Sequence, residues 1–156
     1  MAGTGFLIDT QLLVLLVAGL TSTALIGQHK RLKAYSPEDF NELVKLLGRP
    51  QRLLLTPHVL AETSNLLRQI DEPARGGLMA SLAELVRMNE ERTIASRDVV
   101  SGSDSAAPGA FGRLGLTDAA LLALCGHDLT LLTADAELWA EAKKAGLKVT
   151  NFAHRR

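Results

Sequence analysis

The chain has 156 residues, the length of a single domain, and 47% of them are apolar, which is enough to bury one core. Its 17 Lys and Arg residues balance its 17 Asp and Glu residues, which excludes a protein that coats nucleic acid or anionic lipid through its net charge. The single cysteine, Cys125, excludes an intrachain disulfide framework and a zinc site built from several cysteines. These features predict one domain over residues 1–156 in a reducing, cytoplasmic setting.

An apolar run near the N-terminus raises the question of a signal peptide or a membrane anchor. The run from Leu12 to Leu20 has nine residues, whereas a helix that spans a bilayer needs about 18 or more. No basic residue precedes the run, although a basic segment from His29 to Lys33 follows it. We therefore expect a helix of a soluble domain and no membrane partner. Periodicity does not decide whether this helix is plain core or the face of a homodimer.

The predicted elements alternate between strands and helices. A strand at Phe6–Ile8 leads within a few residues into the helix at Leu12–Leu20. Two further helices begin with a capping residue followed by proline, at Ser36-Pro37 and Thr56-Pro57. The later predictions are helices at 37–47, 57–70, 73–92, 117–126 and 134–145, and strands at 53–55, 129–133 and 147–152. Short apolar strands separated by helices are typical of a parallel sheet covered on both faces, so the predicted fold class is α/β.

Residues 101–115 interrupt this alternation. The segment SGSDSAAPGAFGRLG contains four glycines, three serines and one proline. This composition predicts a flexible loop inside the domain. A loop of this length is either a gate over a substrate site or a disordered excursion.

Four acidic residues follow strands or lie early in the helices that come after them: Asp9, Glu62, Asp118 and Asp135. Because side chains at the carboxyl ends of parallel strands meet at one edge of the sheet, we expect the four carboxylates to share a small volume. Each acid alone has a structural explanation, as a helix N-cap, a first-turn acid or a solvated boundary residue. Together, with no Lys or Arg beside them, they would repel one another unless a cation neutralised them. Oxygen ligands of this kind select Mg²⁺ or Mn²⁺.

Four stretches of the sequence resemble, in order, the four acidic motifs of the PIN domain family. They are FLIDT around Asp9, TPHVLAETSN around Glu62, GLTDAA around Asp118 and LLTADAEL around Asp135. The resemblance spans nearly the whole chain. It implies a three-layer α/β/α sandwich with a central parallel sheet of about four to five strands. It also implies divalent-metal-dependent cleavage of phosphodiester bonds, usually in RNA.

The resemblance assigns roles to particular side chains. Four carboxylates would bind one or two Mg²⁺ or Mn²⁺ ions and act in catalysis: Asp9, Glu62, Asp118 and Asp135. Around them, Thr10 and Thr133 would orient ligands or water, and Asn65 would partner Glu62 from one helical turn away. The implied activity is that of an endoribonuclease that leaves 5′-phosphate and 3′-hydroxyl ends. Because the family includes toxin ribonucleases, an antitoxin protein is a further expected partner.

Candidate contacts to single-stranded or structured RNA come from local basic residues. Lys30, Arg31 and Lys33 form one cluster, a second basic stretch begins at Lys143, and Arg113 lies in the glycine-rich segment. Each could hold a phosphate backbone, and each is explained equally well as part of a solvated surface. The alternative function is a non-catalytic RNA- or protein-binding module on the same fold. In that case the acids cap helices, and metal neither stabilises nor activates the protein.

Overall fold

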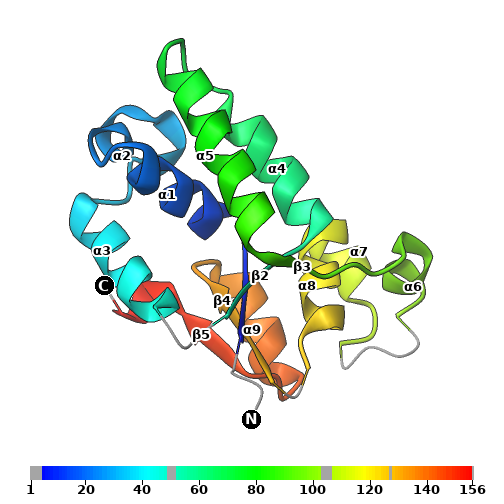
Figure 1. The fold of residues 1–156 in the computed structure, drawn as a ribbon. Helices are drawn as coiled ribbons and strands as arrows, with labels where there is room; N and C mark the ends of the chain where they lie inside the picture. The colour runs from blue at the N-terminus through cyan, green and yellow to red at the C-terminus, as the bar shows by residue number, and fades with distance from the viewer. Residues whose placement is uncertain (1–4, 49–51, 103–106, 127, 156) are drawn as a thin grey trace.

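A computed structural model describes residues 5–48, 52–102, 107–126 and 128–155 (Figure 1). The strands are β1 (Gly5–Ile8), β2 (Arg52–Leu55), β3 (Glu90–Glu91), β4 (Leu129–Thr133) and β5 (Val149–Asn151). The first helices are α1 (Thr10–Thr21), α2 (Ala24–Gln28), η1 (Lys30–Leu32), α3 (Pro37–Leu47), α4 (Pro57–Leu67) and α5 (Ala74–Met88). They are followed by α6 (Ser96–Ser101), α7 (Ala110–Leu114), α8 (Leu116–Leu124), α9 (Ala136–Lys144) and η2 (Phe152–Arg155).

The strands form one parallel sheet in the order β3-β2-β1-β4-β5. The chain first moves outward from β1 to β3 and then returns to build β4 and β5 on the other side of β1. Because crossovers between parallel strands are right-handed, the helices that follow β1 and β2 cover one face, and α9 covers the other. This arrangement confirms the predicted α/β sandwich and a parallel sheet of five strands.

The reversal of strand order lies between β1 and β4, which are neighbours in the sheet. Their register pairs Ile8 with Leu132, so both strands end at the same edge. The backbone N–H of Asp9 donates to the carbonyl of Leu132 over 3.1 Å, which extends the pairing one residue past β1. In open parallel sheets, the groove beyond the carboxyl ends at such a reversal is the usual place for a functional site.

Helix α1 forms the centre of the core. Every residue from Leu12 to Gly19 is buried, and the exposed Leu20 follows them. The apolar run is therefore core from Leu12 to Gly19, which accounts for its composition without a partner chain. No helix in the described part of the chain is long and apolar enough to cross a membrane.

The helix starts at Ser36 and Thr56 are confirmed. The Ser36 hydroxyl accepts from the N–H of Asp39, whose carboxylate accepts from the N–H of Ser36, so the two residues form a capping box. Thr56 likewise accepts from the N–H of Val59 over 3.3 Å. The helix predicted to start at residue 117 starts one residue earlier, because α8 begins at Leu116 after Gly115, which has a φ of 89°.

The expectation of an irregular loop over residues 101–115 is corrected in part. Residues 110–114 form the short helix α7, which is bounded by Gly109 at φ 79° and Gly115 at φ 89°. These two glycines adopt left-handed or related conformations that other residues disfavour, so they serve as helix boundaries. Residues 103–106 of the predicted loop lie outside the described residues.

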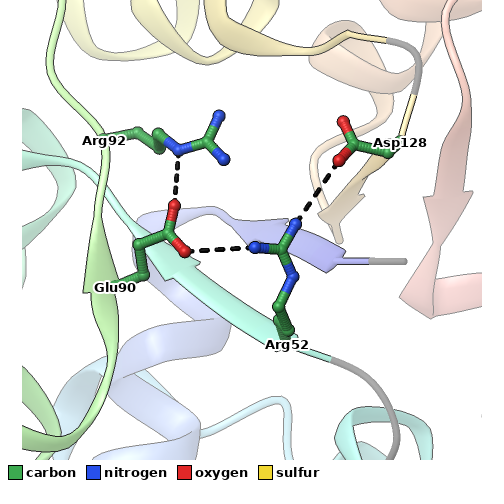
Figure 2. A network of polar contacts seen from close by, with 4 residues as sticks. All are labelled: Arg52, Glu90, Arg92 and Asp128. Carbon is green, nitrogen blue, oxygen red and sulfur yellow. Dashed lines mark hydrogen bonds and ion pairs between the residues drawn. The ribbon is translucent and has the colours of Figure 1, made fainter. Parts of the chain in front are cut away.

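A charged network joins three strands (Figure 2). Arg52, the first residue of β2, contacts Glu90 of β3 at 3.1 Å and Asp128, just before β4, at 3.4 Å. Arg92 contacts the other oxygen of Glu90 at 2.6 Å. These side chains are partly exposed, so each pair contributes little to stability, about 0–1 kcal/mol. Their effect is geometric, because they fix the starts of β2 and β4 relative to the short edge strand β3.

The packing of α1 generates a test of the core. A Cβ added at Gly19 would lie 2.0 Å from Cδ1 of Phe40. Overpacking of this kind costs about 1–3 kcal/mol, which exceeds the gain of up to about 1 kcal/mol in helix propensity. We expect Gly19→Ala to lower the free energy of unfolding by about 1–2 kcal/mol in urea denaturation.

The matched control is Gly27→Ala in α2. A Cβ there meets no atom within 4 Å, so the substitution should raise the free energy of unfolding by up to about 1 kcal/mol. If Gly19→Ala stabilises the protein as Gly27→Ala does, the close approach of α1 and Phe40 is incorrect.

Candidate functional site

The four predicted acids come together at the carboxyl edge of the sheet. Asp9 follows β1, Asp135 follows β4, Glu62 lies in the second turn of α4, and Asp118 lies in the first turn of α8. All four line one open pocket of about 250 Å³. Its other described lining residues are Thr10, Gln11 and Leu66, so no Lys or Arg is among the described residues that line it. The pocket therefore concentrates negative charge without a protein cation to balance it.

Asp9 is the most deeply buried of the four acids, with 5% of its surface exposed. Its Oδ1 accepts from the N–H of Leu12 at 3.1 Å, so Asp9 is the N-cap of α1. Its Oδ2 accepts from the hydroxyl of Thr133 and from the N–H of Ala134. Burial raises the pKa of Asp9 to about 6, even though these three hydrogen bonds lower it. The carboxylate is thus held rigidly at the junction of β1 and β4.

Glu62 is fixed by two threonines. Thr10 donates to Oε1 of Glu62 at 3.1 Å, and Thr117 donates to Oε2 at 2.5 Å. The hydroxyls come from the first turns of α1 and α8, so Glu62 joins both helices to α4. The sequence analysis did not predict Thr117 as a site residue, because a threonine at the start of a helix is usually explained as a cap. Its place directly before the predicted site acid Asp118 was the one feature of the sequence that could have indicated this role.

Asp135 is exposed, and its Oδ1 accepts from the N–H groups of Glu137 and Leu138 at 2.8 and 2.9 Å. The structural explanation as an N-cap is therefore confirmed for Asp135 as it is for Asp9. The backbone N–H of Asp135 donates to Oγ1 of Thr133 at 2.9 Å. Thr133 thus connects the backbone at Asp135 to the side chain of Asp9.

Asp118 is half-buried and makes no side-chain hydrogen bond within the described part of the chain. Burial, followed by the charges of Asp135, Asp9 and Glu62 in that order, raises the pKa of Asp118 to about 7. The three neighbouring acids act on Asp118 through space, so the four carboxylates form one electrostatic unit. Near neutral pH, Asp118 therefore carries a proton part of the time.

The donor set has the chemistry of a hard-cation site, but it is not arranged as one. Carboxylate and hydroxyl oxygens are the ligands that Mg²⁺ and Mn²⁺ prefer. Among the described residues, however, no group of three or more His, Cys, Asp or Glu side chains is positioned to hold a metal ion. The hydrogen bonds explain the difference, since Asp9, Glu62 and Asp135 point oxygens toward protein donors.

The remaining predicted site residues are distributed unevenly. Asn65 is exposed on α4 and does not line the pocket. Arg113 lies on α7, where Glu141 binds it through two contacts of 3.0 and 2.8 Å, and it lines a different pocket, of about 370 Å³. The basic segment with Lys30, Arg31 and Lys33 lies in and just after η1. Sequence reasoning missed Gln11, although its place two residues after Asp9 put it in the first turn of α1.

Comparisons with protein families and with curated proteins found no match.

The raised pKa values predict how stability depends on pH without metal. Both Asp9 and Asp118 hold their protons more tightly in the folded state than at the ordinary Asp pKa of 3.8. Their contribution to stability is therefore fully present below about pH 4 and is lost as pH rises through 6 to 7. In EDTA, we expect the melting temperature to fall between pH 5 and pH 8. Asp118→Asn should flatten this fall and melt higher than wild type at pH 8.

The control for this prediction is Asp71→Asn, which removes an exposed carboxylate outside the pocket. It should leave the pH profile unchanged. Differential scanning fluorimetry across the pH range makes the comparison, and a profile of Asp118→Asn that parallels wild type would contradict the electrostatic coupling.

Proposed function

We propose that this chain is a divalent-metal-dependent endoribonuclease of the PIN type that hydrolyses phosphodiester bonds in RNA. The observation that carries the proposal is the convergence of Asp9, Glu62, Asp118 and Asp135 in one pocket without a described basic residue. Four carboxylates at the sheet reversal raise the energy of the metal-free state, as the raised pKa of Asp118 indicates. A bound cation would remove this cost. The order of the four motifs, which resembles that of the PIN domain family, gives independent support.

In this proposal the chain positions its own ligands. Asp9, Glu62, Asp118 and Asp135 would hold Mg²⁺ or Mn²⁺, which supplies an acidified water and neutralises charge on the phosphate oxygens. Thr133 keeps Asp9 oriented toward the end of β4, and Thr10 keeps Glu62 facing α1. To hold a cation, Asp118 would have to be ionised, so binding would be favoured by higher pH. No side chain is required as a nucleophile.

A second candidate function is a non-catalytic RNA- or protein-binding module. The observation that favours it is the capping role of Asp9 and Asp135, together with the absence, among the described residues, of a ready metal-binding group. In this case the acids are retained for helix capping, and the pocket takes no ion. The expected toxin role and its antitoxin partner rest on the family resemblance alone and stay predictions.

The first test measures metal binding and cleavage together. Saturating Mg²⁺ or Mn²⁺ should raise the melting temperature of wild type, because a ligand present at 100 times its Kd stabilises the native state by about 2.7 kcal/mol. The same preparation should cleave a labelled single-stranded RNA, and EDTA should stop the cleavage. Asp118→Asn should lose both responses, while the control Asp71→Asn keeps them. If metal leaves wild type unmoved and RNA intact, the binding module is correct.

The second test identifies the products. Attack by water on phosphorus leaves a 5′-phosphate on one fragment and a 3′-hydroxyl on the other. The fragments should therefore be ligatable at the 5′ end without kinase treatment, and mass spectrometry should show no cyclic phosphate. Fragments that end in a 2′,3′-cyclic phosphate would indicate attack by the ribose hydroxyl and would contradict the proposed chemistry. RNA with a single 2′-deoxy linkage at the cut site is the matched substrate control and should still be cleaved.

A further inference from the structure

The basic segment at η1 is attached to the candidate site through a pocket-lining side chain. Gln11 lines the carboxylate pocket, and its Nε2 donates to the backbone carbonyl of Arg31 at 2.6 Å. The contact spans 20 residues of sequence and fixes η1 against the first turn of α1. The backbone of Arg31 is therefore one hydrogen bond away from the wall of the pocket.

The side chain of Arg31 is held on the same side of the site by a residue just past the end of α4. Its Nε donates to Oε1 of Gln69 at 2.7 Å. Gln69 lies two residues beyond α4, and its backbone N–H donates to the carbonyl of the pocket-lining Leu66 at 3.1 Å. Arg31 is thus tied to two pocket-lining residues, to Gln11 through its backbone and to Leu66 through the side chain and backbone of Gln69. Arg31 is exposed, and its terminal nitrogens make no hydrogen bond within the described part of the chain.

Other candidate cations are placed differently. Lys143 and Lys144 close α9, which begins at Asp135 and runs back along the sheet. They lie about 12–14 Å along the helix from that acid, toward the opposite edge. Arg113 is bound by Glu141 in a separate pocket. In the part of the chain that the structure describes, the basic stretch at η1 is connected to the carboxylate pocket by a hydrogen bond, whereas Lys143, Lys144 and Arg113 do not line that pocket.

We propose that Arg31 binds a backbone phosphate of the RNA beside the bond that is cut, and that Gln11 and Gln69 position it there. This inference rests on the proposed function. Phosphates of a stacked strand recur about every 3.4 Å along its axis, so a cation tied to two residues of the pocket wall contacts a phosphate close to the one that reacts. The carboxylates and their ion hold the reacting phosphate, and Arg31 holds its neighbour. Positive charge at η1 thereby offsets the repulsion that the acidic pocket exerts on the rest of the strand.

The test measures binding and cleavage separately. Affinity of a fluorescein-labelled 12-nucleotide single-stranded RNA is measured in EDTA at several salt concentrations, so that no cleavage occurs. Arg31→Ala should raise Kd by about fivefold and reduce the slope of log K against log salt by about 0.7, the value for one phosphate contact on a single strand. Arg31→Lys should restore most of the slope because it keeps the charge. The control Lys143→Ala should change neither quantity.

The cleavage arm distinguishes this proposal from the proposed function. In Mg²⁺, Arg31→Ala should raise KM with kcat unchanged, because the contact is equally strong before and during reaction. If wild type cleaves RNA and Arg31→Ala alters neither Kd nor KM, the phosphate site is wrong while the ribonuclease stands. If wild type binds RNA through Arg31 but never cleaves it, the ribonuclease is wrong while the phosphate site stands. Wild type that does not bind RNA at all overturns the phosphate site.

Arg31→Ala should fold normally, because Gln11 contacts the backbone carbonyl of residue 31, which alanine retains. Gln69→Ala gives a second measurement, since it leaves the charge of Arg31 in place and removes its anchor. Its expected effect is a raised KM with an unchanged salt slope. A reduced slope in Gln69→Ala would overturn the positioning role of Gln69.

Discussion

The buried carboxylate of Asp9 is the interaction on which the site depends. One oxygen caps α1, and the other binds the hydroxyl of Thr133 and the N–H of Ala134 at the end of β4. A single side chain therefore connects the two central strands where the strand order reverses. Burying a carboxylate is costly unless hydrogen bonds compensate for the lost water, and here three donors do so. The position of Asp135 follows from this junction, because β4 ends and α9 begins beside it.

The carboxylates that line the pocket also make hydrogen bonds that hold the fold together. Asp9 and Asp135 cap helices, and Glu62 joins three helices through two threonines. Each of these roles stabilises the fold locally. The combined negative charge of the three acids, by contrast, opposes ionisation of Asp118 and raises its pKa. A protein that needed only caps could place them apart, since a cap acts within its own first turn. Their concentration around one pocket is the feature that capping does not explain.

Much of the fold could be predicted because its signals are local. Short apolar strands, the Ser36 and Thr56 caps and the acids after β1 and β4 are each specified within a few residues, and the structure places them as expected. The failures involve information from distant residues. Thr117 looks like a cap, but its hydroxyl bonds to Glu62, 55 residues away. Residues 110–114 belong to the glycine-rich segment 101–115, yet they form α7, where Arg113 pairs with Glu141 of α9. The link from Gln11 to Arg31 left no pattern in the sequence at all.

The edges of the sheet have a consequence for how copies of the chain behave in crowded solution. An open strand edge exposes unpaired N–H and C=O groups that can recruit a strand from another molecule. Here β3 has two residues, both glutamates, and β5 has three. Edges this short offer few main-chain groups for pairing. The sheet is thereby protected from edge-to-edge growth between copies of the chain, although its central strands β1 and β4 are almost wholly buried and largely apolar.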